Sequence, residues 1–278
     1  MPECFGCNIT KTKTEFSNNQ WKKRVGQRKC KVCVPPPASK APKTYKNYGG
    51  PVDEQNVKQA LDNDEVVLVC DTETSGRGER NSVIQLSAYR MGVDNGESKC
   101  ELDDLLHLNA KVVIRPEVLA LWGGYIDRAE LHQASPTDAL HKFIELISAP
   151  EVKFVIWYNA EFDCRMMLSS IRRELGEAAA QLFLGLSIEK SRCAMIRARS
   201  KHRFRNFLSL SVLAFAYGIQ PTNLPLHTAA GDVKLTIRVL NAMIANQHLD
   251  PRKVEWAYAI PGPLRSLEQL CVLWGYWA

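Results

Sequence analysis

The spacing of apolar positions becomes regular after about residue 55, where strand-like and helix-like segments begin to alternate. The short apolar run Val66–Cys70 is bounded by polar residues and predicts a buried central strand. Ser82–Tyr89 predicts a second strand, Lys111–Ile114 a third and Lys153–Trp157 a fourth. Strands separated by helical patterns indicate an α/β domain.

Apolar residues at helical spacing predict the helices of this domain. One helix has Ser135 as its N-cap and Pro136 at its first position, and it continues through ALHKFIELI. Three more helices are predicted in EFDCRMMLSSIRREL, which begins at Glu161, in LSLSVLAFAYG and in HTAAGDVKLTIRVLNAMIANQ. The chain from Asp250 onward is rich in Pro, Gly and Trp, and we expect a packed but irregular extension there.

The composition divides the chain into four parts. Residues 1–34 are rich in Cys, Lys and Arg and poor in aliphatic residues, so they need a staple such as a metal to fold. Residues 35–54 contain much Pro, Gly and Lys, which is typical of an extended, semi-rigid linker. Residues 55–248 form the predicted α/β domain, and residues 249–278 form the C-terminal extension.

The sequence contains no run of about eighteen apolar residues, so we expect no membrane span. The N-terminal residues MPECFGCNITKTK lack the apolar segment of a secretory signal. We therefore expect an intracellular protein, nuclear or cytoplasmic, whose cysteines are thiols or metal ligands.

The net charge of +6 is concentrated at one end of the chain. Residues 1–50 contain eleven Lys and Arg against two Glu, a net charge of +9, and the rest carries 25 basic against 28 acidic residues, or −3. A basic arm on a nearly neutral body favours a polyanionic partner such as nucleic acid, although a solvated tail has the same composition.

Two acidic residues, Asp71 and Glu73, follow the predicted central strand. Because strand side chains alternate, both acids point to one side and Thr72 points to the other. Adjacent carboxylates at the end of a buried strand repel each other unless a cation holds them. The alternative interpretation is a strand that runs into a polar turn.

Three further polar residues can complete such a site. Asp163 lies in the first turn of the helix after the Lys153–Trp157 strand, where it either caps the helix or points toward the acids of the first strand. His227 and Asp232 lie in one predicted helical run and on roughly one helix face. A surface His and Asp on an amphipathic helix is the alternative for that pair.

The segments CDTETSG, YNAEFD and HTAAGD resemble, in order, the three motifs of the DnaQ-like DEDDh 3′→5′ exonuclease family, and the resemblance covers about residues 62–247. It implies a ribonuclease H-like fold, a mixed sheet flanked by helices. It also implies hydrolysis of phosphodiester bonds at nucleic-acid 3′ ends with two Mg²⁺ or Mn²⁺ ions. Tyr158 departs from the family, whose members often carry His at this position.

The resemblance also implies a role for each matching residue. Asp71 would bridge the two ions, Glu73, Asp163 and Asp232 would complete their coordination, and His227 would act as general base. Thr74, Ser75 and Asn159 would approach the terminal nucleotide, although Thr and Ser before Gly also suit a turn. The basic run Arg197–Arg205 is expected to be a loop that contacts phosphates, or else a solvated surface.

The N-terminal cysteines form two CxxC pairs, Cys4 with Cys7 and Cys30 with Cys33. Four thiolates at this spacing predict one structural Zn²⁺, against the alternatives of a redox pair or disulfides. The segment FSNNQWKKRVGQRKCKVC resembles a small fungal LIM-like zinc finger. Its basic and aromatic residues suit nucleic-acid binding, and a protein partner is the alternative.

Two other functions remain open beside the exonuclease. One is a non-catalytic adaptor for nucleic acid or protein on a nuclease fold, and the complete set of five residues argues against it. The other is a proofreading subunit that serves a polymerase. The sequence leaves open whether single-stranded RNA or DNA 3′ ends are the substrate, because that choice depends on how the pocket meets the 2′-hydroxyl.

Overall fold

The chain divides into two compact units, Met1–Lys46 and Asn47–Ala278. This computed structural model describes residues 48–76, 78, 80–92, 98–106, 135–204, 208–220, 224, 226–259 and 270. All of them belong to the second unit. The cysteine pairs predicted to bind Zn²⁺ and the strand predicted at Lys111–Ile114 lie outside these residues.

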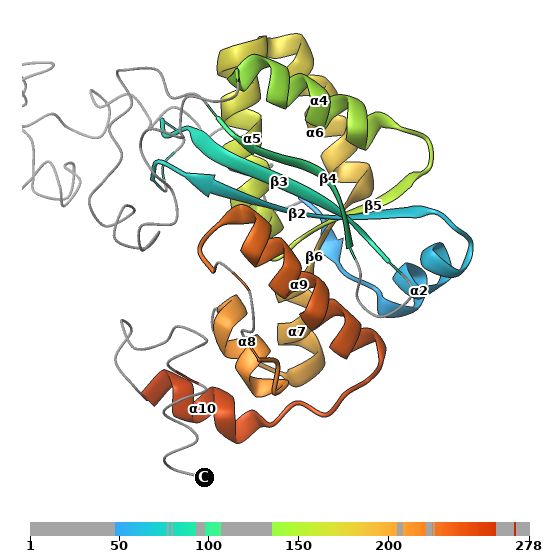
Figure 1. Cartoon of the computed structure of the whole chain (residues 1–278), viewed down its shortest axis with the longest axis vertical. Helices are drawn as coiled ribbons and strands as arrows, with labels where there is room; N and C mark the ends of the chain where they lie inside the picture. Colours follow the sequence, from blue (N-terminus) through green and yellow to red (C-terminus); the bar gives the residue numbers. More distant parts are fainter. Residues whose placement is uncertain are drawn as a thin grey trace, which may run out of the picture. The chain divides into compact units, whose positions relative to one another are not determined.

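A single mixed sheet forms the centre of the second unit (Figure 1). Among the described residues its strand order is β1-β6-β5-β2-β3-β4. The bounds of the strands are β1 (Gly50–Pro51), β2 (Val66–Thr74), β3 (Val83–Met91), β4 (Ser98–Leu105), β5 (Val152–Trp157) and β6 (Ser191–Cys193). β2, β3 and β4 are antiparallel neighbours, whereas β5 lies parallel to β2, β6 parallel to β5, and β1 parallel to β6.

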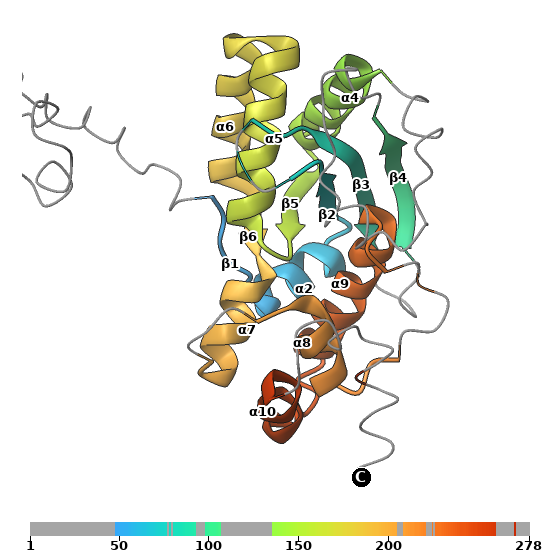
Figure 2. The same ribbon diagram turned by 90° about the vertical axis from the view of Figure 1, so that its left-hand side faces the viewer.

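Helices cover both faces of this sheet, as Figure 2 shows. The bounds of the described helices are α2 (Glu54–Asp62), α4 (Pro136–Ser148), α5 (Ala160–Leu175), α6 (Glu177–Lys190), α7 (Ala194–His202), α8 (Leu210–Ala216), α9 (Ala229–Ile244) and α10 (Pro251–Ala259). α4, α5 and α6 pack together on one face, and α9 crosses β2 and β3 on the other, with α8 behind it and α10 against α8. The predicted α/β architecture, a mixed sheet flanked by helices, is confirmed.

The buried middle of the sheet accounts for the strands that the sequence pattern predicted. Val67, Leu68 and Val69 of β2 are fully buried, because β2 has neighbours on both edges and helices on both faces. The start of α4 also agrees with its sequence. The Ser135 hydroxyl accepts a hydrogen bond from the Asp138 N–H at 3.4 Å, and Pro136 opens the helix.

Four sequence predictions were wrong in the described residues. The basic run from Arg197 is helical as far as His202, as part of α7, and is not a loop. His227 precedes α9 instead of lying within it, because Thr228 is the N-cap. The region after Asp250 begins with helix α10. Part of the predicted linker pairs with the sheet as β1.

The pattern of apolar residues did not predict several elements. β4 has the polar sequence SKCELDDL and pairs with only β3 among the described strands. α6 has apolar residues on its exposed side as well, among them Leu182 and Ile188, so it has no helical periodicity that separates it from α5. None of the helices in the described part of the chain combines the length and the apolar character needed to cross a membrane.

Candidate metal centre

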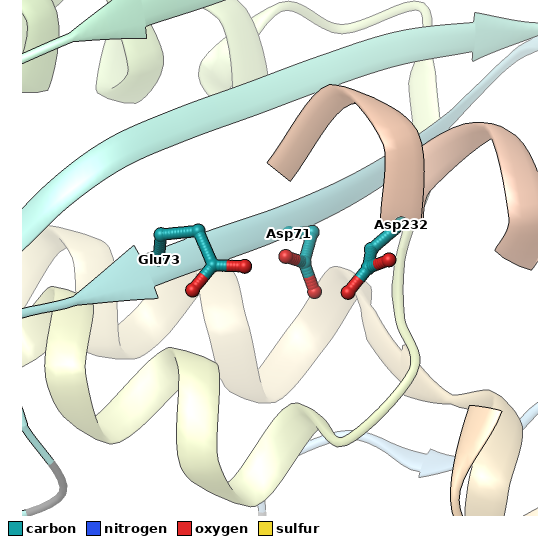
Figure 3. A group of neighbouring side chains, drawn as sticks. All are labelled: Asp71, Glu73 and Asp232. Carbon is teal, nitrogen blue, oxygen red and sulfur yellow. The ribbon is translucent and has the colours of Figure 1, made fainter. Parts of the chain in front are cut away.

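Three carboxylates meet beside the middle of the sheet (Figure 3). Asp71 and Glu73 come from β2, two residues apart, so the strand presents both on one face. Asp232 comes from the first turn of α9, which packs on that face. One carboxylate oxygen from each residue lies within 4.8 Å of the other two, a spacing that a single cation can span.

The charges of this cluster oppose one another. Burial raises the pKa of Asp71 well above its usual value, and the negative charges of Asp163, Asp232 and Glu73 raise it further. A group of half-buried carboxylates that repel one another is stabilised by a cation. Hard oxygen ligands of this kind suit Mg²⁺ or Mn²⁺, so the residues present fit the ions that the sequence motifs imply.

Asp163 lies beside this cluster and is not one of its three members. It stands in the first turn of α5, is only 3% exposed, and accepts a hydrogen bond from the Thr72 hydroxyl at 2.8 Å. Burial raises the pKa of Asp163 to about 7, while the Thr72 hydrogen bond lowers it and the charge of Asp232 raises it. Thr72, which points away from its two acidic neighbours in β2, therefore holds this carboxylate.

His227 is tied to the same cluster through its backbone. Its N–H donates to Oδ1 of Asp232 at 3.3 Å, and its φ of 63° lies in the left-handed region. Non-glycine residues rarely adopt this conformation, which costs about 1 kcal/mol or more and persists only where neighbouring contacts hold it. The turn brings His227 next to Asp232 without placing both residues on one helix face.

The three predicted substrate contacts have local roles in the described structure. The Thr74 hydroxyl donates to the Gly76 carbonyl at 2.9 Å, and the fully buried Ser75 hydroxyl accepts from the Ser82 N–H at 3.0 Å. Both hydroxyls thus support the turn between β2 and β3, which is the alternative that the sequence left open. Asn159 is the N-cap residue of α5 and makes no side-chain cap hydrogen bond. Contact of these residues with a nucleotide stays a prediction.

Sequence reasoning missed two residues that support the cluster. From the sequence, Thr72 was predicted only to point away from the two acids. Its hydroxyl, buried in a strand, was a signal that a hydrogen-bond partner lies nearby. Thr228 accepts from the Gly231 N–H at 3.0 Å and so starts α9 four residues before Asp232. Thr228 followed by Asp232 within one turn gave a helix-start signal that the predicted longer helix obscured.

No protein-family model matches this sequence, and no curated protein matches it. Solved structures resemble the fold, among them these three. Exonuclease I, in a structure said to suggest how processivity is achieved, has a TM-score of 0.53 and 17% identity, covering 70% of this chain and 43% of that chain. E. coli exonuclease I in complex with a dT13 oligonucleotide has a TM-score of 0.52 and 17% identity, with the same coverage. S. pombe Pop2p, in a Mg²⁺- and Mn²⁺-bound form, has a TM-score of 0.51 and 18% identity, covering 74% of this chain and 97% of that chain.

These similarities show that the chain has a ribonuclease H-like fold. The matching region spans less than half of the exonuclease I chains. At identities of 17% and 18%, the likeness concerns the fold alone.

Proposed function

We propose that this protein is a metal-dependent 3′→5′ exonuclease that hydrolyses phosphodiester bonds at nucleic-acid 3′ ends. The observation that carries this proposal is the convergence of Asp71, Glu73 and Asp232 within 4.8 Å on a ribonuclease H-like fold. The fold by itself does not specify a reaction, whereas a cluster of carboxylates suits a reaction at a phosphate group. The similarity to exonuclease I agrees with this assignment.

The carboxylates of Asp71, Glu73 and Asp232 would hold the divalent ions, and Asp163 would contribute from α5. Two divalent ions, when bound, activate a water and stabilise the charge that develops on the attacked phosphate and the leaving oxygen. The protein itself supplies a fixed group of negative charges, with Asp71 at its centre. Because Thr72 holds Asp163 in place, that carboxylate is oriented before any ion arrives.

His227 would act as the general base that takes a proton from the attacking water. Histidine is the side chain that most often serves as a general base near neutral pH. The hydrogen bond from its backbone N–H to Asp232 keeps it close to the carboxylates.

The decisive experiment compares Asp71→Asn with the unchanged protein in a gel assay of a 5′-labelled oligonucleotide with Mg²⁺. We expect trimming from the 3′ end to fall by about 10³-fold or more, since a bound metal supplies several kcal/mol of transition-state stabilisation. Asp62→Asn, at an exposed residue of α2, is the control and should trim normally. Undiminished trimming by Asp71→Asn would refute the site.

The substrate class requires a panel of substrates. Matched single- and double-stranded RNA and DNA should be degraded at different rates, and we propose single-stranded 3′ ends as the preferred class. A chain that binds these oligonucleotides but degrades none of them with Mg²⁺ or Mn²⁺ is a non-catalytic adaptor.

We further propose that Cys4, Cys7, Cys30 and Cys33, outside the described residues, bind one structural Zn²⁺. Metal analysis of the whole chain should then find about one zinc per molecule, and Cys30→Ser should reduce that content. Full zinc content in this variant would contradict the assignment. The zinc module is proposed to bind nucleic acid, with a protein partner as the alternative.

A further inference from the structure

The sheet face that carries the acids continues as a polar surface onto β3 and β4. In the register of β2 and β3, Asp71 lies opposite Ser87 and Glu73 lies opposite Gln85. In the register of β3 and β4, Ser87 lies opposite Asp103. Because opposite residues in neighbouring strands point to the same face, all five side chains share the face that α9 covers.

Gln85 links this surface to the first residue of α9. Its Oε1 accepts a hydrogen bond from the Ala229 N–H at 2.9 Å, and its Nε2 donates to Oδ1 of Asp103 at 3.3 Å. The Ser87 hydroxyl donates to the same oxygen of Asp103 at 2.5 Å. Since an ionised carboxylate only accepts, Asp103 requires the NH₂ group of Gln85 to face it, which leaves the amide oxygen for Ala229.

The Gln85–Ala229 hydrogen bond is shielded from water. Gln85 is 7% exposed and Ala229 is fully buried. Ala229 is the first residue of α9, where a backbone N–H has no partner within the helix. A buried N–H that loses its acceptor costs about 1 to 3 kcal/mol, so this contact constrains where the helix begins.

Ala229 lies two residues after His227, whose backbone is in the left-handed region. Two contacts of this turn are local to α9, one from the His227 N–H to Asp232 and one from the Gly231 N–H to Thr228. The contact with Gln85 joins residues 144 positions apart and ties the turn to the sheet. That sheet also carries Asp71 and Glu73.

We propose that Gln85, oriented by Asp103 and Ser87, is a positioning residue that sets His227 against the carboxylates. This inference rests on the proposed exonuclease function, with His227 as its base. The amide nitrogen of Gln85 bonds Asp103 and its amide oxygen bonds Ala229, so Gln85 acts through the turn that it anchors. Misplacing a catalytic group by about 1 Å can cost about 10²-fold in rate, so a single hydrogen bond at this turn has a measurable effect.

The first test is Gln85→Met, which keeps a side chain of similar length and removes the amide. We expect kcat on a single-stranded oligonucleotide to fall by about 10-fold or more, with KM changed by less than about twofold. Asp53→Ala is the matched control, because it removes the side-chain acceptor at the start of α2. It should leave kcat unchanged. A Gln85→Met variant with the kcat of the unchanged protein overturns the positioning role.

A double-mutant cycle separates action through His227 from general loosening of the fold. In a His227→Ala background, adding Gln85→Met should lower kcat by less than about twofold, because the group that Gln85 positions is already gone. The same 10-fold loss in both backgrounds would mean that Gln85 does not act through His227.

The orientation by Asp103 is tested by exchanging the two side-chain types. Gln85→Glu places a second carboxylate beside Asp103, and we expect kcat to fall. The combination Gln85→Glu with Asp103→Asn restores an amide beside a carboxylate, with an acceptor still available to Ala229, and should recover most of the loss. Because this pair keeps the size and shape of both side chains, it also covers the case in which Gln85→Met does not fold. Failure of the combination to recover activity contradicts the proposed orientation.

Hydrogen exchange distinguishes the inference from the proposed function. Backbone amides of residues 226–233 should exchange faster in Gln85→Met than in the unchanged protein, whether or not the protein is a nuclease. An unchanged chain without nuclease activity overturns the proposed function, and a His227→Ala variant at full rate overturns the assignment of His227 as its base. A His227-dependent nuclease that is indifferent to Gln85→Met, with unchanged exchange, overturns the positioning role alone.

Discussion

The residues at the candidate metal centre differ in charge, burial and backbone conformation. Asp71, Glu73 and Asp232 form a cluster of like charges, and Asp163 lies deeper, where the Thr72 hydroxyl partly compensates its burial. His227 is placed by its backbone, because its left-handed turn directs the chain from the preceding loop into α9. Each residue can therefore be tested by a substitution that alters one property.

The role of His227 is tested by His227→Ala. We expect turnover to fall by about 10²-fold or more, because the variant lacks the proposed general base, while binding of a single-stranded oligonucleotide stays the same. The measurements are single-turnover rate and fluorescence anisotropy on the same substrate. Normal turnover in this variant would exclude His227 as the base.

Thr72 is tested by a pair of substitutions. Thr72→Val keeps the shape of the side chain and removes the donor to Asp163, so we expect the free energy of unfolding to fall by about 1 to 3 kcal/mol. Thr72→Ser keeps the hydroxyl and should lose less. Urea denaturation of both variants measures the difference. Equal losses would mean that the hydroxyl does not support Asp163.

At the scale of elements, helix positions decide which charges are available to a ligand. α7 carries several basic residues, and the structure pairs two of them internally. Arg197 Nε lies 2.7 Å from Glu54 and Lys201 Nζ lies 3.3 Å from it, so α7 is joined to the start of α2. These two cations hold helices together, and they are poor candidates for binding phosphate.

We expect Glu54→Gln to lower the free energy of unfolding by about 1 kcal/mol, since Arg197 and Lys201 are partly exposed and solvent weakens their pairing with Glu54. Asp62→Asn breaks a more exposed pair with Lys58 and should change stability by less than about 0.5 kcal/mol. Thermal unfolding of the two variants gives the comparison. Equal changes in stability for the two variants would show that the pairing of Glu54 with α7 does not stabilise the protein.

At the scale of the whole molecule, the large positive net charge and the carboxylate cluster lie in different units. The carboxylate cluster belongs to Asn47–Ala278, whereas the +9 net charge belongs to the basic N-terminal residues. A basic segment outside a catalytic unit can raise affinity for any polyanion without changing the reaction. The division after Lys46 leaves β1 in the second unit, where it pairs with β6.

Deletion of residues 1–46 should therefore lower the salt dependence of oligonucleotide binding and leave Mg²⁺-dependent trimming in place. If the segment neutralises three or more phosphates, the slope of log affinity against log salt should fall by about two units, at about 0.7 per phosphate of a single strand. Anisotropy across a salt series measures the slope. An unchanged slope would indicate that this segment serves a protein partner instead.

The sequence by itself determined the features that arise from neighbouring residues. Asp71 and Glu73 share a face because strand side chains alternate, and α4 starts at Ser135 because capping is a local interaction. The apolar run Val66–Cys70 predicted the central strand, because a short apolar run bounded by polar residues is a local signal of a buried strand. The α/β class follows from such local patterns in sum.

Only the tertiary structure decided the contacts between distant segments. The motif resemblance implied that Asp232 joins the acids of β2, and the structure gives the spacing of that cluster. The structure also pairs Asp163 with Thr72 and sets His227 outside the helix in which the sequence pattern placed it. A helix start depends on which acceptor meets its first N–H, and at α9 one such acceptor is Gln85 on a distant strand. Contacts of this kind depend on packing between segments, which local periodicity does not encode.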